Sequence, residues 1–185
     1  SMMVGREVSA EARPRTKVTS GEVMLKVEGL STKKLLRDVS FEVRKGEVLG
    51  FAGLMGAGRT EVARCVFGAD PRSTGTIQVH GRTVNVREAS DAVRAGIGYL
   101  SEDRKQFGLL LEQDIKANTV MAAMRDFNIG GFILDGKIRT VGQEYSQKLR
   151  VKTPNVHQLL GKLSGGNQQK VVISKWLVRN CDVLI

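Results

Sequence analysis

The chain has 185 residues and carries 29 Lys and Arg against 19 Asp and Glu, a formal net charge of +10. Its apolar fraction of 41% argues against a disordered protein, and no stretch reaches the ~18 consecutive apolar residues of a membrane-spanning helix. The two cysteines, Cys65 and Cys181, lack the spacing of a zinc site and cannot form a disulfide framework, which favours a reducing compartment. Glycine is enriched, at 21 of 185 residues, which predicts turns that other residues resist.

The first part of the chain divides into a polar arm and a series of β patterns. Residues 1–21 hold scattered basic side chains and Pro14 without periodicity, and we expect a linker or a tag remnant there. Short patterns at 23–27 and 39–43 predict strands, the second with one buried face because its apolar residues alternate with polar ones. The unbroken apolar run at 48–52 predicts a strand covered on both faces, as in a parallel sheet.

Helix and strand patterns alternate after residue 60, which is typical of an α/β domain. The first is a helix at 60–67, which contains Cys65 as a small apolar residue and stops at Gly68. A hairpin of 75–79 and 83–86 follows, with its turn around His80 and Gly81. A helix at 90–95 and a strand at 97–100 come next.

The pattern then becomes mostly helical. Asn118 is expected to cap a helix whose apolar face includes Val120 and Phe127, and a second helix is expected around 141–149. The remaining expected features are a loop at 128–131, a helix at 167–178 with Trp176 and Leu177 in the core, and residues 182–185, which begin like a buried strand.

Glycines follow the expected strand at 48–52 directly, as Gly-Leu-Met-Gly-Ala-Gly-Arg-Thr at residues 53–60. A phosphate-binding loop requires a strand, a glycine loop and a helix in this order. Gly56 and Gly58 let backbone N–H groups point at a polyphosphate, and Thr60 offers a hydroxyl to Mg²⁺. Arg59 stands where the pattern has Lys, and a planar guanidinium fits less well between phosphates than a compact ammonium. A glycine-rich turn without a ligand is the alternative interpretation.

A second glycine segment, Leu-Ser-Gly-Gly-Asn-Gln-Gln-Lys, occupies residues 163–170. Ser164 is expected to cap the helix that follows, and the two glycines would expose its first N–H groups as a second anion site.

Together these segments resemble motifs of the ATP-binding cassette (ABC) ATPases. Residues 53–60 resemble the Walker A loop, and residues 163–170 resemble the signature motif. With Tyr-Leu-Ser-Glu-Asp-Arg-Lys at 99–105, they are similar to the second cassette of bacterial monosaccharide importers of the ribose, xylose and galactose type. The similarity runs from about 22 to 185.

The resemblance implies an α/β fold, with a P-loop NTPase core of the ABC ATPase type, an antiparallel β subdomain and a helical insertion at about 103–164. Residues 22–185 are then expected to be an incomplete nucleotide-binding domain whose C-terminal part is missing. Residues 1–21 are expected to be the linker from a first cassette.

The resemblance also assigns roles to residues of this sequence. Glu102 stands at the Q-loop position, where the family usually has glutamine, and with Thr60 it is expected to ligate Mg²⁺ beside ATP. The signature residues are expected to clamp the γ-phosphate of ATP in an opposite, head-to-tail cassette. Residues 31–38 contain no aromatic side chain to stack on adenine. The expected nucleotide-binding residues are Gly53, Met55, Gly56, Ala57, Gly58, Arg59, Thr60 and Glu61, and the expected signature residues are Leu163, Ser164, Gly165, Gly166, Asn167 and Gln168.

No catalytic residue is expected within the chain, because the Walker B acids and the switch histidine of the family belong after Ile185. His80 is expected to be a hairpin residue and His157 a surface residue. The full-length protein is therefore expected to be an ATPase that drives sugar translocation, and the 185-residue chain alone is expected to be inactive.

The expected partners are the first nucleotide-binding domain of the same polypeptide, transmembrane permease subunits and, indirectly, a periplasmic sugar-binding protein. The expected location is the cytoplasmic face of the bacterial inner membrane, and no nucleic acid is expected. Two alternatives remain: a soluble ABC-type ATPase that acts on nucleic acid, which would explain the basic charge, and a structural domain that binds no nucleotide.

Overall fold

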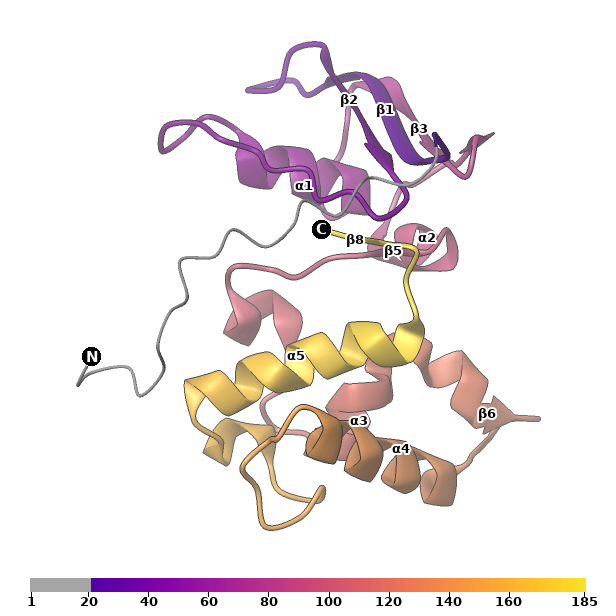
Figure 1. The fold of residues 1–185 in the computed structure, drawn as a ribbon, viewed down its shortest axis with the longest axis vertical. Coiled ribbons are helices and arrows are strands. Elements are labelled where there is room, and N and C mark those ends of the chain that lie inside the picture. The colour runs from indigo at the N-terminus through magenta and orange to yellow at the C-terminus, as the bar shows by residue number, and fades with distance from the viewer. Residues whose placement is uncertain (1–20) are drawn as a thin grey trace.

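The computed structural model describes residues 21–185, so the linker expected at 1–21 lies outside the described residues except for Gly21. Two lobes make up the molecule, one carrying a β-sheet and α1, the other made mainly of α3, α4 and α5 (Figure 1). Between them lies a short parallel strand pair. None of the helices within residues 21–185 is long and apolar enough to cross a membrane.

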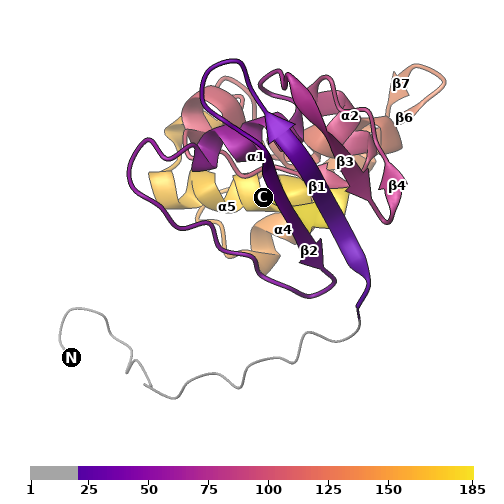
Figure 2. The same ribbon diagram turned by 90° about the horizontal axis from the view of Figure 1, so that it is seen from above.

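An antiparallel sheet of order β2-β1-β3-β4 forms the first lobe, and Figure 2 shows its strands side by side above α1. In its register, Val27 of β1 lies between Phe41 of β2 and Ile77 of β3. His80 and Gly81 have φ of 50° and 71°, which closes the predicted β3–β4 hairpin with a left-handed turn. The strands are β1 (Val23–Ser31), β2 (Val39–Arg44), β3 (Thr74–Val79) and β4 (Arg82–Thr83).

The helix predicted at 60–67 is α1 (Arg59–Phe67), and Gly68 ends it in the left-handed conformation with φ of 76°. Cys65 is buried within it, as predicted. The predicted helix and strand that follow are α2 (Ala89–Arg94) and β5 (Ile97–Gly98), and the C-terminal strand is β8 (Val183–Leu184), which pairs with β5 in parallel.

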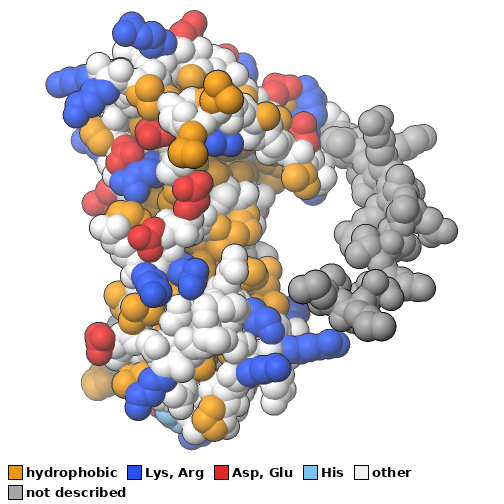
Figure 3. Space-filling view, turned by 90° about the vertical axis from the view of Figure 1, so that its left-hand side faces the viewer, with side chains coloured by type: hydrophobic (Ala, Val, Ile, Leu, Met, Phe, Trp, Pro, Cys, Tyr) orange, Lys and Arg blue, Asp and Glu red, His pale blue; other side chains and the backbone are white. Residues whose placement is uncertain are grey.

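The prediction of a doubly covered strand at 48–52 is wrong. This segment is irregular, and Val48 is 96% exposed. A strand needs a neighbour to pair its backbone groups, and no strand among the described residues pairs with this segment. Phe51 instead packs edge-on against Phe41, with ring centroids 5.0 Å apart. The segment and Ile185 line an apolar cleft of about 280 Å³, and hydrophobic side chains gather at the waist between the lobes (Figure 3).

The second lobe is mostly helical and contains α5 at its interface with the first lobe. The predicted loop at 128–131 is a small hairpin with Gly130 and Gly131 at its turn. The elements of this part are η1 (Arg104–Gly108), α3 (Ile115–Val120), η2 (Met121–Phe127), β6 (Asn128–Ile129), β7 (Phe132–Ile133), α4 (Asp135–Lys148), η3 (Leu160–Lys162) and α5 (Gly165–Arg179).

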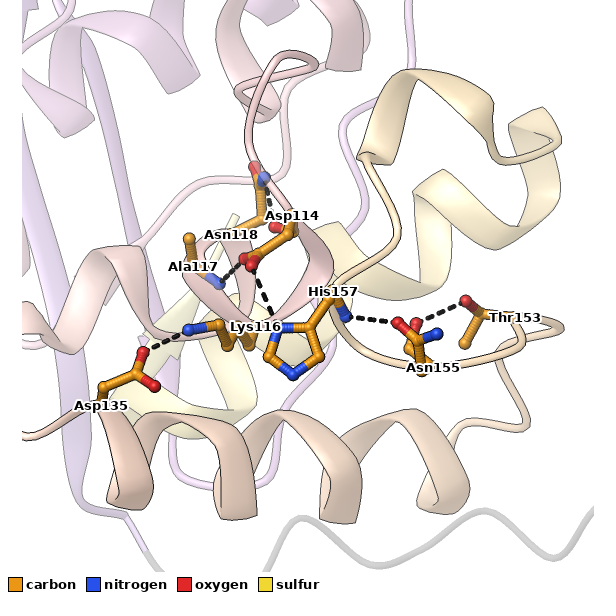
Figure 4. Close-up of polar contacts among 8 residues, drawn as sticks. All are labelled: Asp114, Lys116, Ala117, Asn118, Asp135, Thr153, Asn155 and His157. Atoms are coloured by element: carbon orange, nitrogen blue, oxygen red, sulfur yellow. Dashed lines mark hydrogen bonds and ion pairs between the residues drawn. The ribbon is translucent and has the colours of Figure 1, made fainter.

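The expected helix cap at Asn118 is wrong, because Asp114 has that role. Its Oδ1 accepts a hydrogen bond of 2.8 Å from the backbone N–H of Ala117 (Figure 4). Asn118 lies inside α3 and is fully buried. Its Oδ1 accepts a hydrogen bond from the backbone N–H of Leu110, and its Nδ2 donates one to the carbonyl of Leu110. The exposed His157 lies beside the cap, with Nδ1 3.9 Å from Asp114 Oδ2.

The core runs through both lobes and the strand pair between them. Trp176 of α5 is part of it, as predicted, and its ring packs edge-on against Phe67 at 5.9 Å. The prediction that Leu177 also lies in the core is wrong, because this residue is 42% exposed.

Candidate functional site

The glycine loop at 53–58 leads directly into α1 and adopts a conformation that requires glycine. Gly56 and Gly58 have φ of 81° and 85°, which side-chain-bearing residues rarely adopt. A Cβ on Gly58 would also lie 2.9 Å from Cδ2 of Leu36, whereas a Cβ on Gly56 would meet nothing within 4 Å. The loop therefore packs on one side and is open on the other.

The glycine loop ends at the N-terminus of α1, with Gly58 at the N-cap position. Within residues 21–185 no side chain caps this helix, so the N–H groups of its first turn are available to a ligand. An uncapped N-terminus carries a partial positive charge and favours a bound anion. Arg59, at the first helical position, and Met55, which is 97% exposed, both lie on the surface around it.

The structure brings Thr60 and Glu102 together at this helix end. Thr60 Oγ1 lies 3.4 Å from Glu102 Oε1. Neighbouring oxygen ligands of an octahedral Mg²⁺, each about 2.1 Å from the ion, lie about 3 Å apart. A hydroxyl and a carboxylate are also the hard oxygen donors that Mg²⁺ prefers, so the pair fits this ion.

An ion pair between Arg64 and Asp70 holds the C-terminal turn of α1. Arg64 donates from Nε and Nη2 to the two carboxylate oxygens of Asp70, at 2.7 and 2.8 Å. These hydrogen bonds hold the pKa of Asp70 below its ordinary value. Cys65 is buried, and burial raises the pKa of its thiol, which is typical of an apolar core cysteine.

The second glycine segment forms the N-terminus of α5. Ser164 occupies the N-cap position, but its hydroxyl does not cap the helix. Its Oγ instead accepts a hydrogen bond of 2.9 Å from Nδ2 of Asn167, whose Oδ1 accepts from the N–H of Lys152 at 2.9 Å. The predicted exposed helix start therefore agrees with the structure, whereas the predicted cap by the Ser164 side chain does not. No hydrogen bond among the described residues joins this segment to the loop at 53–58.

Gln168 differs from the other signature residues because it is buried. It donates from Nε2 to the carbonyls of Leu160 and Leu163, both at 3.2 Å, and accepts from Nε of Arg104 at 3.3 Å. Its position in the core makes it a structural support for the loop at 163–166.

Two basic residues near the site were not predicted from the sequence. Arg104 follows Glu102 by two positions and contacts Gln168. Lys175 of α5 is 4% exposed, and its Nζ donates a hydrogen bond of 2.8 Å to the carbonyl of Gly108. Burial lowers the pKa of Lys175 to about 8. A lysine between apolar positions of a core helix is the one sequence signal that could have identified it.

Comparison with known proteins places these features in a family context. A family model described as ABC transporter matches residues 36–185. The chain is 54% identical over 185 residues to the "Putative ribose/galactose/methyl galactoside import ATP-binding protein 1" of Burkholderia lata, covering 100% of this chain and 36% of that protein. It is 49% identical over 183 residues to the "Ribose import ATP-binding protein RbsA 3" of Rubrobacter xylanophilus, covering 99% and 36%. The chain thus spans about a third of the length of these curated relatives.

Solved structures confirm the predicted fold class. The ATP-binding cassette MJ0796, in a dimeric post-hydrolysis state with ADP and Pi, superposes with a TM-score of 0.69 at 19% identity, covering 87% of this chain and 72% of that one. A nucleotide-free cassette from an ABC transporter gives 0.67 at 19% identity, covering 88% and 67%. The chain therefore shares the mixed α/β architecture and antiparallel sheet of these cassettes.

Proposed function

The chain belongs to the ABC transporter family of ATP-binding cassettes, and on this premise we propose that it binds ATP and Mg²⁺ as the second cassette of a monosaccharide importer. The observation that carries the proposal is the 3.4 Å approach of Thr60 Oγ1 and Glu102 Oε1 at the uncapped N-terminus of α1. A phosphate-binding loop and two hard oxygen ligands meet there.

In this proposal, different residues of the site contact the phosphates and the Mg²⁺. The left-handed glycines Gly56 and Gly58 shape the backbone around the phosphates, and the N–H groups at the start of α1 donate to them. Thr60 and Glu102 would hold Mg²⁺, which when bound neutralises phosphate charge. The remaining proposed contacts to the nucleotide come from Gly53, Met55, Ala57, Arg59 and Glu61.

Arg59 sets this cassette apart from one with the usual lysine. Its guanidinium is planar and broad, so it attracts the phosphates but does not sit as a point charge between them. We therefore propose weak nucleotide binding at this loop.

The signature segment serves a second site in this proposal. Residues 163–166 present an uncapped helix start, and they would contact the γ-phosphate of ATP held by the first cassette of the same polypeptide. The relatives are nearly three times as long as this chain, which leaves room for such a cassette. We assign residues 22–185 to the second cassette, with a helical subdomain at about 103–164.

The names of the relatives support a proposal about the transport partners of this chain. Several of these are described as import ATP-binding proteins for ribose or galactose. We propose that this chain likewise works with transmembrane permease subunits at the cytoplasmic face of the inner membrane, and indirectly with a periplasmic sugar-binding protein.

Equilibrium titration of the 185-residue chain with a fluorescent ATP analogue tests the binding proposal. We expect saturable binding that unlabelled ATP displaces and adenosine does not, because the proposed contacts are to phosphates. Absence of saturable binding, or equal displacement by adenosine, would overturn it.

A further inference from the structure

We propose that a polar pocket at the C-terminal end of α4 binds a small phosphorylated sugar. The pocket has a volume of about 310 Å³, which lies within the range of small-molecule sites. Its walls are the last turns of α4 and residues 150–156 of the segment that follows. None of the described residues at 53–61, 102 or 163–168 lines it, so this site is separate from the proposed ATP site.

One face of α4 forms the first wall of the pocket. Gln143, Ser146 and Gln147 lie at positions i, i+3 and i+4, so their side chains project from the same side of the helix. The two glutamines are exposed, and their amides present both donors and acceptors. Ser146 is 8% exposed, and its Oγ has no hydrogen-bond partner among the described residues. This wall therefore suits a ligand with several hydroxyl groups.

Arg150 supplies the positive charge of the pocket. Its backbone has φ of 52°, a left-handed conformation that redirects the chain just after α4. Its side chain is exposed, and no Asp or Glu within residues 21–185 lines the pocket. A guanidinium without a neighbouring carboxylate favours an anion, and its planar fork matches two oxygens of one phosphate group.

The C-terminus of a helix carries a partial negative charge, which acts through its unpaired carbonyl groups. At the end of α4 these groups are already used. The carbonyls of Ser146 and Gln147 accept hydrogen bonds of 2.8 and 2.9 Å from the N–H groups of Val151 and Arg150. The guanidinium of Arg150 therefore determines the charge preference at this end of the pocket.

Hydrogen bonds to α5 hold the second wall in place. The N–H of Lys152 donates to Asn167 Oδ1 at 2.9 Å, and Lys170 Nζ donates to the carbonyl of Arg150 at 2.6 Å. Both bonds fix the backbone on which the charged side chain is mounted. A wall that is already ordered loses little conformational entropy when a ligand binds.

The second wall combines an amide with apolar surface. Asn155 Oδ1 accepts a hydrogen bond of 2.9 Å from the N–H of His157 (Figure 4), and no described residue accepts from its Nδ2. Pro154 and Val156 add apolar atoms beside it. A monosaccharide carries hydroxyl groups along with C–H surface, so it matches a wall of this kind. Together with the guanidinium of Arg150, the pocket has the chemistry for a phosphorylated monosaccharide.

Isothermal titration of the 185-residue chain with ribose 5-phosphate tests the inference, with ribose and inorganic phosphate as separate ligands for comparison. We expect ribose 5-phosphate to bind at least roughly tenfold more tightly than either part, because the guanidinium and the amides then act on one molecule. We expect the same affinity when ATP is present, because the two sites are separate. The titration does not depend on ATP binding, so this inference and the proposed function can fail independently.

Two variants assign the binding to this pocket. Arg150→Gln removes the charge but keeps the backbone hydrogen bonds, and we expect a loss of roughly tenfold or more in affinity for ribose 5-phosphate. Gln147→Leu removes one amide, and we expect the advantage of ribose 5-phosphate over inorganic phosphate to shrink. Lys148→Gln is the matched control, because it makes the same change of charge at an exposed residue of α4 outside the pocket.

We expect Lys148→Gln to bind ribose 5-phosphate as the wild type does. An equal effect of Arg150→Gln and Lys148→Gln, whether a loss or no change, would overturn the inference. So would displacement of ribose 5-phosphate by ATP, or binding no tighter than that of inorganic phosphate.

Discussion

Thr60 and Glu102 are 42 positions apart in the chain, yet Thr60 Oγ1 lies 3.4 Å from Glu102 Oε1. Thr60 belongs to the first turn of α1, whereas Glu102 lies in the segment between β5 and η1. The candidate metal site is therefore built from two segments, and its geometry depends on how residues 102–108 pack against α1. In the proposed function, the phosphate contacts come from the glycine loop and the start of α1.

Substitution of Glu102 separates the contribution of its oxygen from that of its charge. Glu102→Gln keeps a carbonyl oxygen that can ligate Mg²⁺, so we expect weakened but Mg²⁺-dependent binding of the ATP analogue. Glu102→Ala removes the proposed ligand, and we expect a loss in Mg²⁺ affinity of at least about tenfold, no smaller than the loss caused by mutation of an outer-shell partner. Glu112→Gln, at an exposed acid elsewhere, is the control. Equal Mg²⁺ affinity in Glu102→Ala and the wild type would show that Glu102 is not a ligand.

Arg59→Lys tests whether the guanidinium weakens binding at the loop. A compact ammonium can enter between the β- and γ-phosphates, and we expect roughly tenfold tighter binding of the ATP analogue. Arg139→Lys on α4 makes the same chemical change far from the loop and is expected to have no effect. Weaker binding by Arg59→Lys than by the wild type would show that the arginine is the better phosphate ligand here.

Two glycine variants distinguish backbone strain from crowding. Gly56→Ala introduces a side chain at φ of 81° with nothing within 4 Å, and we expect a loss of about 1–2 kcal/mol in unfolding free energy. Gly58→Ala adds a contact of 2.9 Å with Cδ2 of the buried Leu36, and overpacking of this kind costs a further 1–3 kcal/mol or so. Urea unfolding of both variants measures the difference. Equal losses would mean that Leu36 moves aside freely.

The buried lysine gives the protein a pH-dependent stability. Its pKa falls from 10.5 to about 8 on burial, so between pH 8 and about 10.5 the unfolded chain binds a proton that the folded chain does not. The contribution of Lys175 to the free energy of unfolding therefore rises with pH across this window, by up to about 3 kcal/mol. Below pH 8 the full cost of burying the charged ammonium is present. Lys175→Met should be more stable than the wild type at pH 7, and the difference should shrink towards pH 10.5.

Urea unfolding at several pH values measures this difference between the two proteins. The comparison with Lys175→Met cancels the titration of other groups that both proteins share. A difference that stays constant from pH 7 to 10.5 would show that Lys175 is not desolvated in the folded state.

Local patterns in the sequence predicted much of the fold. The helix that ends at Gly68 and the hairpin turn at His80 and Gly81 are determined by short-range backbone preferences, and both are present. The two glycine segments could also be located, because each combines a turn and a helix start within a few residues. The resemblance to ABC ATPases rested on these segments and agrees with the family match.

The remaining features depend on contacts that a local pattern does not contain. The run at 48–52 has the composition of a strand but no pairing partner among the described residues. Asn118 has the side chain of a helix cap, yet the chain folds so that Asp114 lies at the helix start and Asn118 bonds to Leu110 instead. The contacts of Arg104 with Gln168 and of Lys175 with Gly108 join positions 64 and 67 residues apart.

The Mg²⁺ dependence of ATP-analogue binding, compared between the wild type and Thr60→Ala, tests the central claim most directly. Thr60 lies in the first turn of α1 and contacts Glu102, so removal of its hydroxyl should leave the glycine loop in place and take away a proposed metal ligand. The account predicts that Mg²⁺ tightens binding in the wild type and has little effect in Thr60→Ala. Binding that is equally tight with and without Mg²⁺ in the wild type, or equally Mg²⁺-dependent in the variant, would contradict it.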